Sequence, residues 1–413
     1  MRNPSQRATL AALTFIAAAI IAGTAAAEVK LAFIDPLSGG AASAGINAQK
    51  HFTYEIDKIN AAGGLNGEKL SIAFYDNKVD PQESLIALKK ALDEGARYIF
   101  QGNGSAVALA ISDAVLKYNE RNPGKEVLYF NYAAVDPALT NAKCNFWHFR
   151  FDSDADMKMA AMVNFIATQP QVKKVYLINQ DYSFGKAVAA AARKMLAEKR
   201  PDVEIVGDEL HPLQKVQDFS PYVAKIKASG ADTVITGNWS NDMFLLLKAG
   251  KDAGLKVTWY TYYADGLGAP TAIGRDGNGV VKVVTSYHSN AMPELDPDVI
   301  AFKKRFTDKL DEFNYYRLNT AFMMFAAAAA KTKSNDPVKI ARALEGMKLT
   351  TSVGEVEMRA DNHQLLQPLF VATFTDKVKF DAEQTGLGFK TDTKINAKDT
   401  AMPTTCQMQR PNG

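Results

Sequence analysis

The feature that most constrains the fold is a regular alternation of short apolar strands and amphipathic helices. In the first part of the chain, a strand at Val29–Ile34 precedes a helix at Ala44–Ala61, and further strands are expected at 69–75, 98–101 and 127–130, again separated by helices. Strands joined through helices form right-handed crossovers and a parallel sheet. The pattern therefore predicts an α/β unit.

The same alternation begins again after residue 150 and predicts a second α/β unit. Its expected strands are 175–179, 203–208, 233–236 and 257–260. Helices are then expected at 298–313, 318–331 and 337–344, followed by short strands at 369–374 and 378–380. The tail after Gly386 has no periodicity, so we expect it to be irregular.

The first 27 residues are of a different kind. Arg2 and Arg7 precede an apolar run from Leu10 to Ile21, which leads to the small residues 25–27. This arrangement is typical of a secretory signal peptide, cleaved here after Ala27. The run is shorter than the ~20 residues that cross a bilayer, so we expect export rather than a membrane anchor.

Charge argues against nucleic acid as a partner. The chain has 413 residues, with 48 Lys+Arg against 45 Asp+Glu and a formal net charge of +3. Residues 1–27 contain two arginines and no acidic residue, so their removal lowers the net charge by two, from +3 to +1. Binding to nucleic acid needs a clustered basic surface, and the sequence shows none.

Export also changes the meaning of the two cysteines, Cys144 and Cys406. In an oxidising compartment a lone pair of cysteines predicts a disulfide, and two free thiols are the alternative. The disulfide would hold the C-terminal tail against the first third of the chain.

Motifs for catalysis, metals and cofactors are missing. The sequence has no G-x-x-x-x-G-K, G-x-G-x-x-G, G-x-S-x-G or H-E-x-x-H pattern, and its five histidines stand singly. We therefore expect no enzyme, no metal and no cofactor. The alternative is an enzyme: a secreted hydrolase with its active site in a cleft between the two α/β units.

Loops that follow strands offer a binding site instead, because open α/β sheets bind ligands beyond the carboxyl ends of their strands. Asn103, Gly104 and Ser105 follow one strand and open a helix. Backbone N–H groups and the serine hydroxyl there could hold a carboxylate. The alternative is that Ser105 only caps the helix.

Aromatic residues occupy the corresponding loops of the second unit. Tyr182, Phe184, Trp239 and Tyr263 could cover an apolar ligand, or they could form a buried contact between lobes. Asp265 could pair with a ligand ammonium group, or it could be a turn residue before Gly266.

A series of motifs resembles the periplasmic solute-binding proteins of the branched-chain amino-acid family, the receptor subunits of ABC importers. Each motif is short, and the resemblance rests on their order along the whole mature chain. They are Pro36-Leu37-Ser38-Gly39, residues 57–67, Tyr75-Asp76-Asn77, Ala133-Ala134, Pro137–Thr140, Asp181–Gly185, Phe219-Ser220-Pro221 and Ala253-Gly254-Leu255.

The resemblance implies a type I periplasmic binding protein fold: two doubly wound α/β lobes with a ligand cleft and three crossover segments, near Arg150, Ser286 and Pro368. The N-terminal lobe would contain residues 28–150 and 286–367. The C-terminal lobe would contain residues 151–285 and 368–413.

The resemblance also implies roles for site residues. Ser105 matches the serine that binds the ligand carboxylate, and Asp265 or Tyr263 matches the residue that meets its ammonium group. Phe184, Trp239 and Tyr316 match pocket aromatics. Ala133 and Val135 match the family's backbone-contact loop, and Ala134 lies between them in the expected site.

Two departures from the family widen the choice of ligand. Val135 stands where amino-acid binders commonly carry Thr, and Ala44 stands where Tyr often closes the pocket. The expected function is that of a monomeric periplasmic receptor that captures an amino acid or a related small carboxylate and delivers it to an ABC permease. The alternative ligand is an aromatic acid or amide, for uptake or for sensing.

Overall fold

The computed structural model describes residues 28–308, 313 and 315–411. The expected signal peptide, residues 1–27, lies outside this part of the chain. Within the described residues, no helix is long and apolar enough to cross a membrane.

The first lobe is built on a parallel five-stranded sheet in the order β2-β1-β3-β4-β5. Its strands are β1 (Glu28–Asp35), β2 (Lys69–Asp76), β3 (Tyr98–Gln101), β4 (Leu128–Asn131) and β5 (His148–Arg150). Its helices are α1 (Ala42–Ala61), α2 (Pro81–Asp93), α3 (Ser105–Arg121), α10 (Tyr316–Thr332) and α11 (Pro337–Leu344). Phe33 of β1, Phe52 of α1, Phe100 of β3 and Phe322 of α10 pack together in its core, so helices distant in sequence share one sheet.

The second lobe contains a seven-stranded sheet in the order β15-β14-β10-β9-β8-β6-β7. Strands β6 to β10 are parallel, whereas β14 and β15 pair antiparallel at one edge. The strands are β6 (Lys174–Gln180), β7 (Glu204–His211), β8 (Thr233–Thr236), β9 (Thr258–Thr261), β10 (Val281–Thr285), β14 (Leu369–Thr375) and β15 (Gly388–Ile395). The helices are α4 (Ala155–Ile166), α5 (Ser183–Lys199), α6 (Ser220–Ala228), α7 (Asn241–Asp252) and α8 (Ala269–Ile273).

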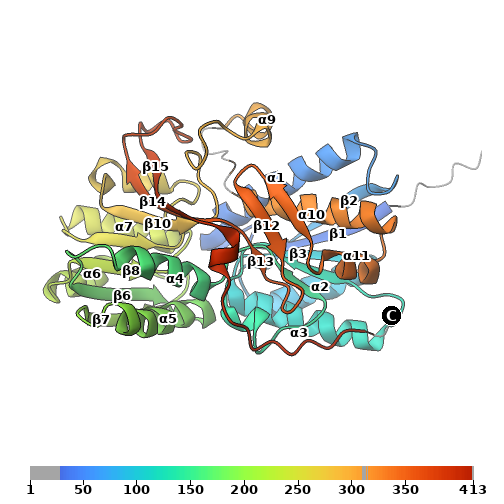
Figure 1. Cartoon of the computed structure of the whole chain (residues 1–413), viewed down its shortest axis with the longest axis horizontal. Helices are drawn as coiled ribbons and strands as arrows, with labels where there is room; N and C mark the ends of the chain where they lie inside the picture. The colour runs from blue at the N-terminus through green and yellow to red at the C-terminus, as the bar shows by residue number, and fades with distance from the viewer. Residues whose placement is uncertain (1–27, 309–312, 314, 412–413) are drawn as a thin grey trace, which may run out of the picture.

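The chain passes between the two lobes after β5, after β10 and before β14 (Figure 1). After β10 it forms α9 (Pro297–Arg305) before it enters α10. A small antiparallel sheet precedes β14 and packs on the core of the first lobe. Its strands are β11 (Lys348–Thr351), β12 (Gly354–Met358) and β13 (Leu365–Leu366). The two-lobed α/β fold predicted from the sequence is confirmed.

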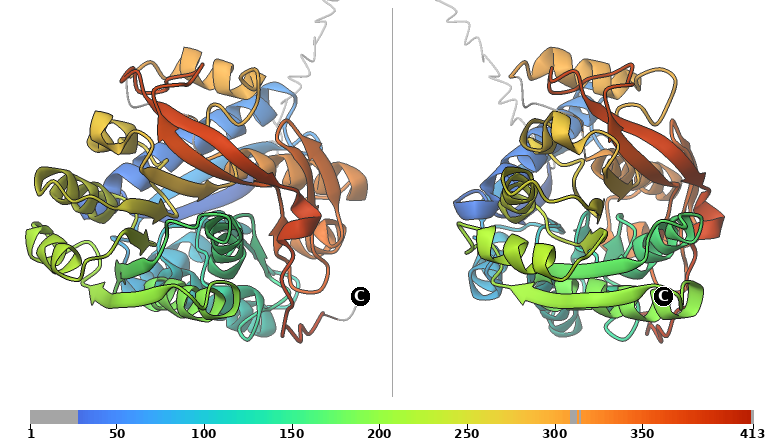
Figure 2. Two further views of the ribbon diagram at one scale, coloured as in Figure 1. Left: turned by 60° about the vertical axis from the view of Figure 1, so that its left-hand side comes forward. Right: turned by 90° about the vertical axis from the view of Figure 1, so that its left-hand side faces the viewer.

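The C-terminal tail differs from the prediction. Residues 388–395 are not irregular but form β15, and residues 397–411 do not stay with the second lobe. Figures 1 and 2 show the tail leaving β15 and running along the first lobe to the C-terminus. The sequence prediction placed this segment in the C-terminal lobe, whereas its hydrogen bonds and its disulfide are made with residues expected in the N-terminal lobe.

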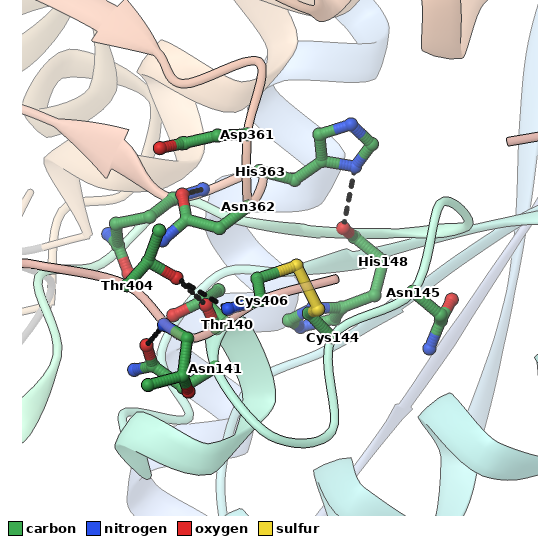
Figure 3. The surroundings of a disulfide bond; sticks show 12 residues. Thr140, Asn141, Cys144, Asn145, His148, Asp361, Asn362, His363, Thr404 and Cys406 are labelled. Carbon is green, nitrogen blue, oxygen red and sulfur yellow. Dashed lines mark hydrogen bonds between the residues drawn. A yellow bond between two sulfur atoms is a disulfide. The ribbon is translucent and has the colours of Figure 1, made fainter. Parts of the chain in front are cut away.

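A disulfide fastens the tail. Cys144 and Cys406 are bonded across 262 positions, as the export argument predicted (Figure 3). Thr404 Oγ1 donates to the Thr140 carbonyl at 3.1 Å, and Asn141 Oδ1 accepts from the next backbone N–H of the tail. We propose that the first lobe comprises residues 28–150, 286–367 and 397–411, and the second lobe residues 151–285 and 368–395.

Three smaller differences each concern a single element. The helix expected at 298–313 ends at Arg305, and Val378–Phe380 is not a strand. The short strand β5 was missed because three residues, His148–Arg150, carry too little periodicity to stand out.

Candidate ligand-binding cleft

A cavity of about 760 Å³, counting the part open to solvent, lies between the two lobes. Its size falls within the range of small-molecule sites. All the predicted site residues except Tyr316 line it. The cavity-lining residues are Ser43, Ala44, Asn47, Gly102, Asn103, Gly104, Ser105, Ala133, Ala134, Val135, Tyr182, Phe184, Trp239, Ser240, Phe244, Tyr263, Asp265, Gly266, Leu267, Tyr315 and Arg317.

The loop between β3 and α3 is held from below by Asp35, the last residue of β1. Its carboxylate accepts from the backbone N–H groups of Gly102 at 3.0 Å and Asn103 at 2.8 Å, and also from the Tyr132 hydroxyl. Burial raises the pKa of Asp35 to about 7, although these three hydrogen bonds oppose the rise. Gly104 follows with φ of +99°, a conformation that favours glycine.

Helix α3 then begins at Ser105 with no side-chain cap. The Ser105 hydroxyl accepts from the backbone N–H of Asp136 at 3.2 Å and keeps its own hydrogen for another partner. Ser105 therefore does not cap α3, and Gly104 occupies the N-cap position. The first N–H groups of α3 and this hydroxyl can together hold an anion.

The loop after β4 is fixed by Asn131. Its Oδ1 accepts from the N–H groups of Ala133 at 3.2 Å and Ala134 at 2.7 Å, and its Nδ2 donates to the Ala134 carbonyl at 2.8 Å. The loop's N–H groups are thus satisfied within the protein. A ligand would meet mainly small methyl groups and carbonyl oxygens on this side.

The second lobe presents aromatic rings to the cavity. Trp239 Nε1 donates to the Tyr182 hydroxyl at 2.8 Å, and Phe184 meets Tyr182 and Tyr263 edge-on at 6.0 and 6.1 Å. The rings lie in loops that follow β6, β8 and β9. They form an apolar surface suited to a ligand's carbon skeleton.

The lobes touch at the mouth of the cavity. Ser240 of the second lobe donates to the Gly40 carbonyl at 3.2 Å, and its hydroxyl lies 3.3 Å from that of Ser43. The two lobes are therefore in direct contact beside the cavity in this structure.

Charged groups are concentrated near the first crossover segment. Lys158 Nζ lies 3.1 Å from Asp152 and 4.6 Å from the centre of the Tyr263 ring. Arg317 Nε lies 3.6 Å from the same Asp152, which is fully buried. Asp265 lines the cavity but is otherwise enclosed by protein. Burial raises its pKa, and a hydrogen bond to Thr285 and the nearby cations partly offset this.

Comparison with known proteins identifies the family. Residues 28–379 match the family model described as periplasmic binding protein. The chain belongs to the periplasmic binding protein family. The Leu/Ile/Val-binding protein homolog 4 of Brucella melitensis biotype 1 is 37% identical over 398 residues, which cover 94% of this chain and 95% of that protein.

Solved structures agree with this assignment. The leucine-, isoleucine-, valine-, threonine- and alanine-binding protein from Brucella ovis, in a closed conformation, superposes with a TM-score of 0.83 at 35% identity, covering 94% of this chain and all of the other. A solute-binding protein of an ABC transporter from Rhodopseudomonas palustris, in complex with 4-hydroxybenzoate, has a TM-score of 0.75 at 20% identity over 90% of this chain and 98% of that one. The second likeness shows the shared fold alone.

Periplasmic binding proteins bind a small-molecule solute between their lobes and work with ABC permeases. The present chain has the corresponding cleft, and the family is one of substrate-binding proteins. Among the described residues, no group of three or more His, Cys, Asp or Glu side chains is placed to hold a metal ion.

Tyr316 is the one predicted cleft residue that this periplasmic binding protein places elsewhere. Its ring stacks on Tyr287 with centroids 4.9 Å apart, and its hydroxyl lies 2.6 Å from that of Ser352. Its neighbours Tyr315 and Arg317 line the cavity instead. Successive side chains near the start of a helix point in different directions. A shift of one position therefore moves a side chain from the cavity wall into the protein core.

Sequence reasoning also missed cavity residues that carry no motif. Tyr315 was hidden by the adjacent Tyr316, because two neighbouring tyrosines match the family's aromatic equally well. Arg317 had no signal at all, since a lone arginine on a helix is usually solvated. The other missed residues are Ser43, Asn47, Phe244, Gly266 and Leu267.

Proposed function

We propose that this periplasmic binding protein captures an α-amino acid between its lobes and delivers it to an ABC permease. It acts as a non-catalytic monomer, exported to the periplasm by a signal peptide that is cleaved after Ala27. The first N–H groups of α3 and the Ser105 hydroxyl hold the ligand carboxylate, and Asp265 holds the ammonium group.

The observation that carries this proposal is the pairing of opposite polarities within one cavity. The first lobe offers uncapped N–H donors and Ser105, which is only 2% exposed. The second lobe offers the Asp265 carboxylate, which lines the cavity. A zwitterion satisfies both groups at once, because each of its charges meets the opposite polarity.

The same arrangement explains closure. A ligand that bridges both lobes binds the closed state better than the open one and shifts the population toward it by that difference in affinity. The contact of Ser240 with Gly40 is made only when the lobes approach, so the closed surface is available to a permease.

An aromatic acid is the second candidate, because the wall of Tyr182, Phe184, Trp239 and Tyr263 suits an aromatic ring. The solved relative from Rhodopseudomonas palustris holds 4-hydroxybenzoate. Such a ligand lacks an ammonium group and would leave the Asp265 carboxylate with only Thr285 and the charges of Lys158 and Arg317 to offset its burial. The amino acid is therefore favoured. A sensing role would use the same cleft with a different membrane partner.

A thermal-shift screen of residues 28–413 tests the proposal, because a ligand that binds only the folded state raises the unfolding midpoint. The panel contains amino acids, their deaminated analogues, aromatic acids and short amides, each recovered afterwards to check for turnover. We expect an amino acid to give the largest shift, and its deaminated analogue to give little.

The variant Asp265→Asn sharpens the test. It should lower the affinity for an amino acid at least about tenfold and leave acids without an amino group nearly unchanged. Asp276, an exposed residue after α8, gives a matched control as Asp276→Asn. A larger shift with 4-hydroxybenzoate than with any amino acid, or turnover of the ligand, would contradict the proposal.

A further inference from the structure

Arg317 is a cation on the cavity wall that the amino-acid site described above does not use. It lies at the start of α10, one residue inside the helix. We infer that Arg317 makes the cleft select a ligand with a second carboxylate, so that the amino acid captured is an acidic one. This inference rests on the proposed function for the carboxylate and ammonium sites.

The donors of Arg317 are unused within the described part of the protein. Its buried Nε has no hydrogen-bond partner, and the closest carboxylate oxygen, on Asp152, is 3.6 Å away. No described residue accepts from its two terminal NH2 groups, and these are not sealed in the interior as Nε is. Four N–H bonds of a planar fork are therefore available to a ligand in the cavity.

The side chain is also held in place for such a contact. The guanidinium lies 4.6 Å from the centre of the Tyr315 ring, and the side chain is only 11% exposed. A cation stacked on an aromatic face keeps its in-plane donors free. Little conformational freedom is left to lose when a carboxylate binds, which favours a bidentate contact.

The balance of buried charge points to an anion as the partner. Asp152 contacts Lys158 at 3.1 Å and also faces Arg317, so two cations share one carboxylate. Among the described residues, Asp265 is the acid on the cavity wall, and it also feels the charges of Lys158 and Arg317. With the ligand ammonium group in place, three cations (Lys158, Arg317 and the ammonium group) share the two carboxylates of Asp152 and Asp265, and a second ligand carboxylate balances the third cation.

A purely structural role for Arg317 fits less well. Asp152 is already neutralised by Lys158 through a direct contact, so it does not need the guanidinium. A structural arginine in this protein looks different: Arg150 is fully buried and donates to Gln364, Asp136, Thr140 and Asp154.

The test compares three amino acids of similar size by isothermal titration calorimetry: glutamate, glutamine and methionine. For the wild-type protein we expect glutamate to bind about tenfold or more tightly than the other two. Glutarate, which has two carboxylates but no amino group, and leucine complete the panel.

In Arg317→Gln the preference for glutamate over glutamine should disappear. Arg317→Lys keeps the charge, so it should keep that preference at a lower affinity. Arg193→Gln removes a cation on the exposed side of the second lobe, where Arg193 pairs with Asp208, and should change nothing. Thermal unfolding without ligand checks that each variant folds, and Arg317→Lys carries the test if Arg317→Gln does not fold.

The outcomes separate this inference from the proposed function. Tight binding of leucine or methionine, with glutamate no better, overturns the role of Arg317 and leaves the amino-acid receptor standing. Binding of glutarate as tightly as glutamate supports Arg317 and overturns the ammonium site. If no amino acid and no dicarboxylate binds, both are wrong.

Discussion

The two walls of the cleft are built in different ways. The first lobe contributes the N–H groups at the start of α3 and small residues, on loops held from behind by the buried side chains of Asp35 and Asn131. The second lobe contributes large rings, joined at Tyr182 and Trp239 by a single hydrogen bond.

This difference assigns different tasks to the walls. Backbone groups are present whatever the side chains are, so the first wall suits a part of the ligand that never varies, its α-carboxylate. Side chains can be exchanged one at a time, so the second wall and Arg317 suit the part of the ligand that varies. The predictions below test this division, from the largest expected effect to the smallest.

Breaking the support of the first wall should have the largest effect. Asp35→Ala leaves two N–H groups and the Tyr132 hydroxyl without their buried acceptor, which should lower the free energy of unfolding by at least about 3 kcal/mol. Chemical denaturation measures this. Asp113→Ala on the exposed side of α3 is the control. Equal stability of both variants would show that the wall does not depend on Asp35.

Removing a ring from the second wall should affect binding rather than folding. Trp239→Ala removes a side chain that is 93% buried against the cavity and the Tyr182 hydroxyl, and should weaken ligand binding by about 2–3 kcal/mol. Trp239→Phe keeps a ring and should lose less. Titration calorimetry measures the affinity of both variants, and scanning calorimetry measures their unfolding midpoints. A lower unfolding midpoint with unchanged affinity would show that the ring of Trp239 serves folding rather than ligand binding.

The pH should affect the first wall through Asp35. Its pKa is about 7 in the folded protein and lower when unfolded, so the native state holds the proton between roughly pH 4 and 7. Its contribution to stability is therefore fully present below about pH 4 and is lost as the pH rises to 7, with a loss of about 3 kcal/mol between pH 5 and 8. Denaturation of the wild type and Asp35→Asn at pH 5 and 8 isolates this contribution. An identical pH dependence in both proteins would contradict it.

The smallest effect is expected at Ser105. Ser105→Ala removes one hydroxyl but leaves the N–H groups of α3, so the affinity for a carboxylate ligand should fall by about 1–2 kcal/mol. Ser112→Ala is a matched control, because Ser112 is also buried on α3 but accepts from Asn145. Unchanged affinity in Ser105→Ala would leave recognition to the backbone alone.

Most of the cleft could be predicted because parallel strands end at one edge of a sheet. The loops with Ser105, Ala133, Phe184 and Trp239 follow strands that the sequence places correctly, so the site follows from the order of elements. Their hydrogen bonds could not be predicted. The role of Asp35 under the loop depends on the approach of β1, β3 and β4, which only the folded sheet shows.

Features that depend on register or on weak pairing could not be predicted. Tyr315 and Tyr316 are equivalent in sequence, and only the start of α10 decides which one lines the cavity. Strand β15 carries only two apolar residues on its inner face, Phe389 and Ile395, with threonines between them, so its apolar alternation is weak and it exists through its pairing with β14. The path of the tail back to the first lobe follows from the disulfide between Cys144 and Cys406, which the sequence predicted, although the lobe boundaries drawn from the family resemblance did not take it into account.

The most direct test of the account is a crystal structure of residues 28–413 with the amino acid that gives the largest thermal shift. The account predicts a ligand carboxylate roughly 3 Å from Ser105 Oγ and the N–H groups of α3, with the ammonium group roughly 3 Å from Asp265. A ligand held only by the rings of the second lobe, with Ser105 and Asp265 both unengaged, would contradict it.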